Sequence, residues 1–321
     1  MVSSNLIDEK EAKSAVIIDL YKCGALHTMN LSALLNSQKV ILLDGAMGTQ
    51  LDKRGLMSRG RNNLDAPEAV LEIHQEYARC GCDCLTTNTL TMNRIYIETH
   101  NVDVDVREVN RAGAELARQA TVKNQYVLGD ISSTGQLLES YGTYTESQFY
   151  DAFKEQAEIL CEAGVDGFII ETMFDLREGL CALAACKDNF SLPVIVSIAF
   201  ATEAKGARTI MGNSAEECAK KIADAGADCL GSNCGDINPT QMAVVVSLLK
   251  SATRLPILTQ PNAGKPKLID DKTVFEMTPS DFTTGIKECL NAGAKLIGGC
   301  CGTSPEHIRA VGEVLDKRLE I

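Results

Sequence analysis

A local pattern that recurs four times along the chain constrains its fold more than any other feature. In each copy a helical segment ends at glycine, a two-residue link follows, and a short apolar strand runs into polar residues or glycine. The copies read RCGCDCLTTNT, EAGVDGFIIET, DAGADCLGSNC and NAGAKLIGGCC. Glycine in that place is typical of a helix C-cap, because it adopts the left-handed conformation that closes the last turn. The pattern therefore predicts helices that alternate with strands.

Four more strand-like runs lie between these copies, which brings the expected number of strands to eight. They are VILLDG (40–45), QYVLGDI (125–131), LPVIVSI (192–198) and LPILTQPN (255–262). The intervening stretches read mostly as helices, for example 145–163, where Thr145 and Gln148 have the spacing of a capping box. Eight alternating units of this total length predict an α/β fold, a single (β/α)₈ or TIM barrel. A doubly wound open sheet is the alternative, but DGAMGTQ matches its phosphate-binding glycine pattern poorly.

The expected barrel occupies residues 38–321, and residues 1–37 form an N-terminal helical extension. Within the extension, NLSALLNSQ predicts a short helix that closes the bottom of the barrel. No run approaches the roughly 18 apolar residues of a membrane span. The net charge of −12 disfavours nucleic acid or an anionic membrane as the main partner. We expect a cytoplasmic protein, and the sequence does not indicate its oligomeric state.

Chemistry in such a barrel is expected where the strands end, on its C-terminal face. Strands six and eight of a barrel are close neighbours, so the cysteine that follows strand six can meet the pair that ends strand eight. These residues are Cys234, Cys300 and Cys301. The neighbouring glycines Gly298, Gly299 and Gly302 would let the backbone turn so that both adjacent sulfurs converge.

Three thiolates without a fourth protein ligand describe an open zinc site, which leaves one position for a substrate. Soft thiolate ligands select zinc or copper(I), and zinc has no redox chemistry of its own. A thiol that enters the open position would lose its proton near neutral pH and stay nucleophilic. Most of the thirteen cysteines, including Cys80, Cys82 and Cys84 in CGCDC, are expected to be buried packing residues instead.

Six segments together resemble the motifs of the homocysteine S-methyltransferases. In order they are LLDGAMGTQL, TTNT, IIETMFDL, GSNCG, QPNAG and IGGCCGTSPEHI, and the resemblance covers roughly residues 38–315. This family includes the homocysteine-binding domain of cobalamin-dependent methionine synthase and betaine–homocysteine methyltransferase. The resemblance implies a zinc-bearing (β/α)₈ barrel that methylates homocysteine, with Cys234, Cys300 and Cys301 as the zinc ligands.

The same resemblance implies which residues bind the substrate. Asp44 and Glu171 would hold the amino group of homocysteine, and backbone amides around Gly45, Ala46 and Met47 would meet its carboxylate. Asn262 would approach the zinc when no substrate is bound. Asp130 stands where the family often has a GP loop, so its role stays open. His74 and His307 read as helix-surface or capping residues rather than ligands.

The methyl donor is less constrained than the acceptor. GGCCGTSP is closer to the methionine-synthase form of the motif, no D-x-H-x-x-G cobalamin signature is present, and the chain lacks tryptophan. We expect methylcobalamin or another methylcorrinoid, carried by a separate corrinoid protein, and short polar loops after strands two, three and seven. S-methylmethionine and betaine remain alternative donors. A zinc-binding thiol sensor and a phosphate-binding barrel enzyme remain alternatives of other classes.

Overall fold

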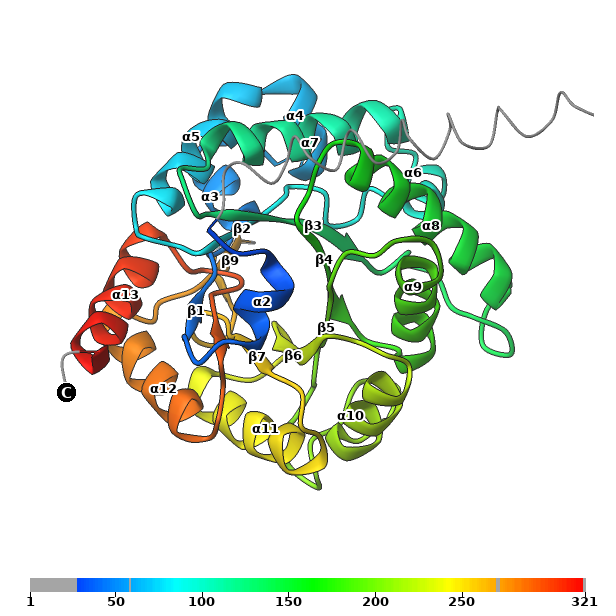
Figure 1. Ribbon diagram of the computed structural model, residues 1–321. Coiled ribbons are helices and arrows are strands. Elements are labelled where there is room, and N and C mark those ends of the chain that lie inside the picture. The colour runs from blue at the N-terminus through cyan, green and yellow to red at the C-terminus, as the bar shows by residue number, and fades with distance from the viewer. Residues whose placement is uncertain (1–27, 58, 270–271, 320–321) are drawn as a thin grey trace, which may run out of the picture.

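The computed structural model is a barrel of eight parallel strands inside a ring of helices (Figure 1), which confirms the predicted (β/α)₈ fold. It describes residues 28–57, 59–269 and 272–319. The barrel strands are β1 (Ile41–Leu42), β2 (Cys84–Thr86), β3 (Tyr126–Ser132), β4 (Gly167–Met173), β5 (Val194–Ile198), β6 (Cys229–Asn233), β7 (Ile257–Gln260) and β10 (Leu296–Ile297). Each of the eight coincides with a strand predicted from the sequence.

The helices follow the strands in the alternation that the sequence predicts. They are α2 (Leu31–Asn36), α3 (Gly48–Lys53), α4 (Asn62–Asp65), α5 (Pro67–Ala78), α6 (Arg94–Thr99), α7 (Val106–Ala120), α8 (Glu146–Glu162), α9 (Leu176–Asn189), α10 (Ala215–Asp224), α11 (Pro239–Ala252), α12 (Pro279–Asn291) and α13 (Pro305–Leu319), with a 3₁₀ turn at Arg59–Arg61. The predicted capping box is present at α8, where Thr145 and Gln148 cap each other's backbone. Among the described residues, no helix is long and apolar enough to cross a bilayer.

The barrel closes between its first and second strands. The hydrogen-bonded order is β1-β10-β7-β6-β5-β4-β3-β2, and a parallel bridge between Leu43 and Cys84 joins the two ends. The Asp44 N–H donates to the Cys84 carbonyl at 3.2 Å, and the Asp83 N–H donates to the Leu42 carbonyl at 2.6 Å. Because β1 also pairs with β10, the loops after the first, second and last strands meet at the same end of the barrel.

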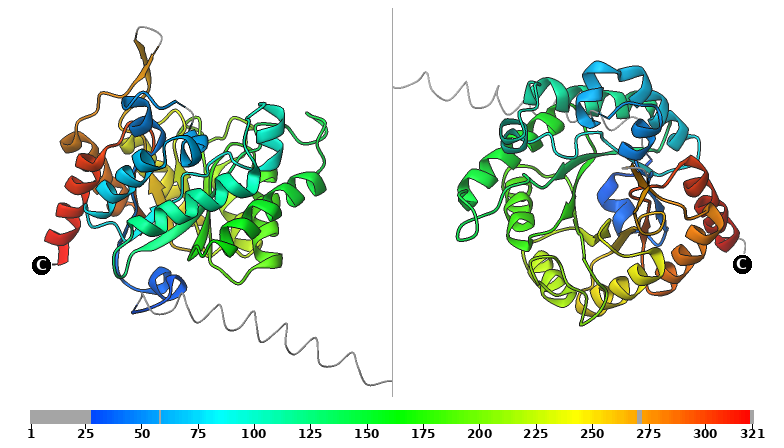
Figure 2. Two further views of the ribbon diagram at one scale, coloured as in Figure 1. Left: turned by 90° about the horizontal axis from the view of Figure 1, so that it is seen from above. Right: turned by 180° about the vertical axis from the view of Figure 1, so that it is seen from behind.

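The short helix α2 plugs the opposite end of the barrel, as predicted for NLSALLNSQ (Figure 2). Its buried side chains Leu31, Leu34 and Leu35 pack against the apolar interior formed by the strands, including Leu128 and Ile169. Asn30 caps the helix by accepting a hydrogen bond from the Ala33 N–H at 2.8 Å. The rest of the predicted extension, residues 1–27, lies outside the described residues.

Two of the loops that the sequence predicts as short and polar are long. Residues 133–145 separate β3 from α8, and residues 261–278 separate β7 from α12. The second of these loops contains an antiparallel hairpin, β8 (Lys267–Ile269) and β9 (Lys272–Val274), that projects from the barrel end opposite α2 (Figure 2). The sequence does not predict this hairpin, because each of its strands has three residues and begins with a lysine. Only the loop after β2, residues 87–93, is short as predicted.

Close strand packing generates a first prediction. An added Cβ at Gly231, in β6, would lie 2.2 Å from the Leu258 carbonyl oxygen and 2.5 Å from the Leu258 Cβ on the neighbouring strand. Neither atom can move without distorting β7. We therefore expect Gly231→Ala to lower the free energy of unfolding by about 2–5 kcal/mol, measured by urea denaturation.

Gly48→Ala is the matched control, because an added Cβ there meets no atom within 4 Å. Gly48 begins α3, where alanine is a better helix former than glycine. The urea midpoint of Gly48→Ala should therefore be equal to that of the wild type or higher. Equal urea midpoints for the two variants would show that β6 and β7 are not packed this closely.

Candidate active site

The three predicted metal ligands converge at the C-terminal face of the barrel. Cys234 directly follows β6, and Cys300 and Cys301 follow β10, which β7 separates from β6 in the sheet. Their three sulfur atoms lie within 4.8 Å of one another. Within the described part of the chain, this is the one group of three or more potential metal ligands that meets that distance. The sequence prediction that these three sulfurs meet is confirmed.

Glycine explains how two adjacent cysteines can face the same point. An added Cβ at Gly299 would lie 2.6 Å from the Thr303 side chain, so only glycine allows the turn that follows β10. Gly302 has φ +82°, in the left-handed region that favours glycine. The Cys300 N–H donates to the Pro261 carbonyl, and the Cys301 carbonyl accepts from the Ala263 N–H, both at 2.9 Å. These backbone bonds anchor both cysteines to the β7 loop.

The donor set fits a zinc ion. Tetrahedral sulfur ligands at the usual zinc distance of about 2.3 Å lie about 3.8 Å apart, close to the observed grouping. Hydrogen bonds from the Cys300 and Cys301 thiols lower the pKa of Cys234, whereas the pKa of Cys300 is raised. The environment of Cys234 therefore favours its ionised form. Asn262 is buried next to Cys234, and its Oδ1 has no hydrogen-bond partner among the described residues.

Three buried carboxyl groups line the same cavity as the cysteines. The cavity has a volume of about 660 Å³, and Asp44, Asp130 and Glu171 reach it from the ends of β1, β3 and β4. Burial raises the pKa of Asp44 to about 7 and that of Glu171 to about 8. Burial and the nearby charge of Glu171 raise the pKa of Asp130 as well. No salt bridge to any of the three is formed within the described residues, so the cavity favours a cationic group.

Asp44 is held in place by the strand next to it. Its two carboxylate oxygens accept hydrogen bonds from the Thr86 N–H at 2.8 Å and the Thr86 hydroxyl at 3.0 Å. Thr86 ends β2, so the bridge that closes the barrel also orients this carboxylate. These two bonds favour the ionised form and partly offset the cost of burying it.

The loop after β1 differs in detail from the sequence prediction. The Ala46 N–H donates to the Thr303 hydroxyl at 3.0 Å, and the Ala46 carbonyl accepts from the Tyr77 hydroxyl at 2.9 Å. The Ala46 amide is therefore not free for a substrate carboxylate. The N–H groups of Gly45 and Met47 have no hydrogen-bond partner in the described part of the chain, and both residues line the cavity.

The mouth of the cavity has an apolar rim. Leu137, Phe174, Ile210 and Met211 line the cavity and have exposed fractions between 37% and 73%. They belong to the loops that follow β3, β4 and β5. Large apolar side chains gathered at an open mouth indicate a surface that another apolar molecule covers.

The remaining sequence predictions have mixed outcomes. His307 is a capping residue, because its Nδ1 lies 2.9 Å from the Ser304 hydroxyl at the start of α13. His74 is fully buried in α5, so its prediction as a surface or capping residue is wrong. Cys82 and Cys84 are buried packing residues as predicted, and Cys80 is partly buried.

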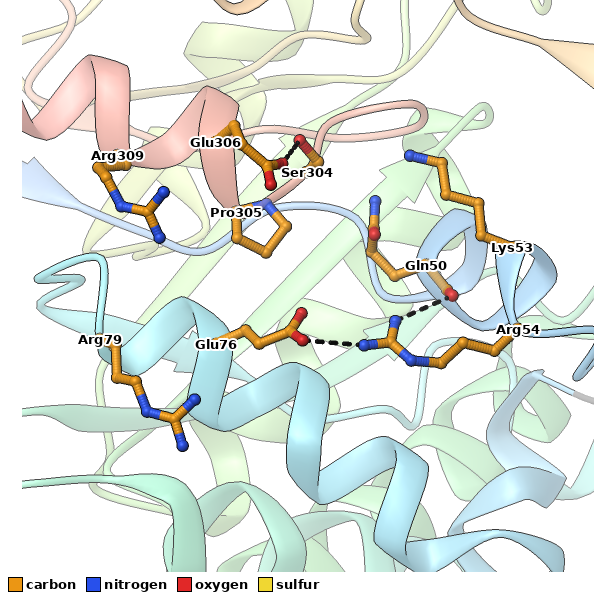
Figure 3. A pocket seen from close by; sticks show the side chains of 9 residues that line it. All are labelled: Gln50, Lys53, Arg54, Glu76, Arg79, Ser304, Pro305, Glu306 and Arg309. Carbon is orange, nitrogen blue, oxygen red and sulfur yellow. Dashed lines mark hydrogen bonds and ion pairs between the residues drawn. The ribbon is translucent and has the colours of Figure 1, made fainter.

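A second cavity, of about 400 Å³, lies among α3, α5 and the start of α13 (Figure 3). Charged side chains line it and partly neutralise one another, as in the ion pair between Arg54 and Glu76 at 3.0 Å. The Ser304 hydroxyl donates to Glu306 on the opposite wall. The cavity contains none of the residues that the sequence predicts as functional.

Sequence reasoning missed one buried residue of the active site. Asn233, the last residue of β6, hydrogen-bonds to Glu171 at 2.6 Å and to both the backbone and the side chain of Thr172. Its position in the sequence could have indicated a place in the active site, because Asn233 immediately precedes Cys234 in the GSNCG segment. Its partners could not be foreseen, because they lie two strands away.

The buried carboxylates generate a second prediction, on stability and pH. The folded-state pKa of Asp44 is about 7 and its ordinary value is 3.8, so the stability that protonated Asp44 provides is present below about pH 4. It is lost as the pH rises through about 7. We expect Asp44→Asn to raise the free energy of unfolding of the metal-free protein at pH 8, by roughly 2–4 kcal/mol, with a smaller gain at pH 5.

The control for this prediction is Asp52→Asn, at an exposed carboxylate of the same cavity. It should change stability by no more than about 0.5 kcal/mol at either pH. Urea unfolding at both pH values measures the effect. An Asp44→Asn variant no more stable at pH 8 than the wild type would show that this carboxylate does not destabilise the fold.

Comparison with known proteins identifies the family. The model of the family described as homocysteine S-methyltransferase matches residues 41–315. The homocysteine methyltransferase MmuM from Escherichia coli, solved in a metallated form, is 24% identical with a TM-score of 0.71, over 88% of this chain and 98% of that chain. Its oxidized form is 23% identical with a TM-score of 0.73, over 88% and 99%.

A more distant likeness concerns the barrel alone. The carboxyl transferase domain of Rhizobium etli pyruvate carboxylase with pyruvate is 15% identical with a TM-score of 0.51, over 90% of this chain and 49% of that chain. At these identities the solved structures show a shared fold, whereas the family match extends over most of the chain and includes all three cysteines. The chain therefore belongs to the homocysteine S-methyltransferase family and is an enzyme that methylates the sulfur of homocysteine.

Proposed function

We propose that this enzyme binds zinc through Cys234, Cys300 and Cys301 and methylates homocysteine from a methylcorrinoid that a separate protein supplies. The observation that carries the proposal is that the three sulfurs and three buried carboxyl groups line one cavity. The sulfur cluster suits a metal that receives the thiol, and the carboxyl groups suit the ammonium group of the same molecule. The metallated form of the Escherichia coli relative supports a metal in this fold.

Each end of homocysteine has a counterpart in the cavity. Asp44 and Glu171 are the acceptors for the ammonium group, and their raised pKa values fall when a cation binds beside them. The free N–H groups of Gly45 and Met47 are the donors for the carboxylate. Asn262, whose buried Oδ1 has no hydrogen-bond partner among the described residues, lies next to Cys234 and can occupy the metal's open position until the substrate arrives.

Zinc held by three thiolates would stabilise the ionised thiol of homocysteine at neutral pH and keep it nucleophilic. The protein's part is to orient that sulfur toward the mouth of the cavity. When the methyl group is transferred, a carbon–sulfur bond forms at homocysteine and the donor's bond to the methyl group breaks. The electron pair of the broken bond stays with the donor.

The shape of the mouth supports a large donor. The cavity is several times the size of homocysteine, and its rim exposes Leu137, Phe174, Ile210 and Met211. A corrin ring carries methyl groups as well as amide side chains around its periphery, and such a rim can pack against the methyl groups. The longer loops after β3 and β7 would border this donor rather than leave the mouth fully open.

A second candidate donor is a small onium compound such as S-methylmethionine. The buried carboxyl groups favour a cation, and Tyr96 and Phe174 are aromatic residues on the cavity wall. Betaine is a third candidate on the same grounds. The cavity disfavours the phosphate-binding alternative, because a phosphate would face Asp44, Asp130 and Glu171 without a buried cation to balance it. A zinc-binding thiol sensor would need the same cluster but no donor.

The third prediction tests the metal site. Cys301→Ser should lose most of its zinc and its methyl-transfer activity, because a serine hydroxyl stays protonated at neutral pH and is a poor zinc ligand. Zinc content is measured by atomic absorption after dialysis. Cys161→Ser, at a half-buried cysteine of α8, is the control and should keep wild-type zinc. Full zinc occupancy in Cys301→Ser would refute the ligand assignment.

The fourth prediction concerns the donor. Zinc-loaded enzyme and homocysteine are incubated in parallel with methylcobalamin, a methylated corrinoid protein, S-methylmethionine or betaine, and methionine is quantified by mass spectrometry. We expect turnover with a corrinoid donor and little with the two onium compounds. Rapid turnover with S-methylmethionine and none with either corrinoid would assign the donor to the onium class. Release of zinc on thiol addition, without turnover from any donor, would favour the thiol sensor.

A further inference from the structure

The side-chain amide of Asn233 connects the two halves of the active site. It is fully buried at the end of β6, one residue before Cys234. Its Oδ1 accepts hydrogen bonds from the Thr172 N–H at 2.9 Å and from the Ser197 hydroxyl at 2.7 Å. Its Nδ2 faces Glu171 Oε2 at 2.6 Å and Thr172 Oγ1 at 2.7 Å. One amide therefore joins the ends of β4, β5 and β6.

The orientation of this amide is determined by its partners. A backbone N–H can only donate, so the Thr172 N–H requires the oxygen of Asn233 on its side. The nitrogen must then face Glu171, whose carboxylate accepts. The same nitrogen lies 3.8 Å from Cys300 Sγ, within reach of a weak hydrogen bond to sulfur. Asn233 thus contacts both the carboxylate proposed for the ammonium group and a thiolate proposed for the metal.

The contact holds a backbone conformation that β4 would not adopt alone. Thr172 has φ +58°, a left-handed conformation that is rare for a β-branched residue. The pairing of β4 with β5 shifts register between Ile170 and Met173, so the strand bulges at Glu171 and Thr172. Both polar groups of Thr172 that face β6 bond to Asn233. Among the described residues, the hydrogen bonds that join β6 to this bulge all come from Asn233.

We propose that Asn233 is a positioning residue that fixes the distance between the ammonium-binding carboxylate and the sulfur cluster, and so selects an amino thiol of homocysteine's length. This inference rests on the proposed function. Cysteine carries the same ammonium, carboxylate and thiol groups but is one methylene shorter. With Glu171 held by β6, cysteine cannot place its sulfur at the cluster and its ammonium at Glu171 together.

A difference of one methylene in a fitted pocket discriminates substrates by about 10- to 200-fold. In this site we infer that such discrimination requires both ends to be held rigidly. A mobile Glu171 would follow the shorter molecule and lose that discrimination. The selectivity between homocysteine and cysteine therefore reports on the rigidity of the spacing. Neither the overall stability of the protein nor its zinc content measures this rigidity.

The experiment measures the binding of homocysteine and of cysteine to zinc-loaded protein by isothermal titration calorimetry, without any methyl donor. Zinc content is measured before and after each titration. We expect the wild type to prefer homocysteine by at least about 10-fold. In Asn233→Ala the dissociation constant for homocysteine should rise about 10- to 100-fold, from the loss of hydrogen bonds to a charged group, with little change for cysteine.

Ser232→Ala is the matched control. Ser232 is the preceding residue of β6, it is fully buried, and its hydroxyl has no hydrogen-bond partner within the described residues. Its removal should leave the selectivity at the wild-type value. A second variant, Thr172→Gly, relieves the positive φ and removes one of the Asn233 contacts, so it should fold and reduce selectivity in the same direction. If Asn233→Ala fails to fold, the selectivity of Thr172→Gly tests whether the contact between Asn233 and β4 determines the spacing.

The outcomes separate this inference from the proposed function. Wild-type selectivity in Asn233→Ala or Thr172→Gly would overturn the inference, and so would a wild type that binds both thiols equally. Loss of zinc from Asn233→Ala would also overturn it, because the residue would then maintain the metal cluster rather than the spacing. A zinc-loaded wild type that fails to bind homocysteine would instead refute the proposed function.

Discussion

The active site depends on two contacts of the first strand, its pairing with the last strand and the bridge to the second strand that closes the barrel. Pairing of β1 with β10 places the loop of Asp44 beside the Cys300–Cys301 turn, and the Gly299 N–H donates to the Asp44 carbonyl at 3.0 Å. The bridge to β2 then supplies both hydrogen bonds that orient the Asp44 carboxylate. If this closure shifted by one residue, successive side chains would exchange faces, and Asp44 would leave the cavity. The backbone hydrogen bonds of β1 therefore determine where the Asp44 carboxylate lies relative to the cysteine turn.

The second general feature is the concentration of buried carboxyl groups in that mouth. Asp44, Asp130 and Glu171 are all buried there, and burial raises each of their pKa values. Buried acids without a cationic partner cost stability, since the protein cannot solvate their ionised forms as water does. A fold selected for stability alone would place apolar or amide side chains in these positions. The cost is understandable if a cation occupies the cavity during function, because its binding offsets the desolvation of the carboxylates.

Much of this arrangement could be predicted from the sequence, and the remainder has a physical reason for being hidden. The eight strands and the convergence of Cys234 with Cys300 and Cys301 follow from local patterns and from the known geometry of a barrel. The hairpin β8–β9 was missed because its short, charged strands carry no apolar alternation. The occupied Ala46 amide was missed because its partner, Thr303, is distant in sequence. Contacts of this kind depend on loop conformations that no local pattern specifies.

The same limit applies to Asn233, which connects the proposed metal subsite with the proposed substrate subsite. Sequence adjacency to Cys234 gives this residue its place on β6, but its partners on β4 and β5 exist only after the sheet forms. A metal at the cysteine cluster would neutralise much of the thiolate charge, and an ammonium group would neutralise the carboxylates at the other end. Because Asn233 contacts both Glu171 and Cys300, one amide links the proposed substrate subsite to the proposed metal subsite. If zinc and homocysteine bind as proposed, both events would favour the same conformation of the bulge in β4.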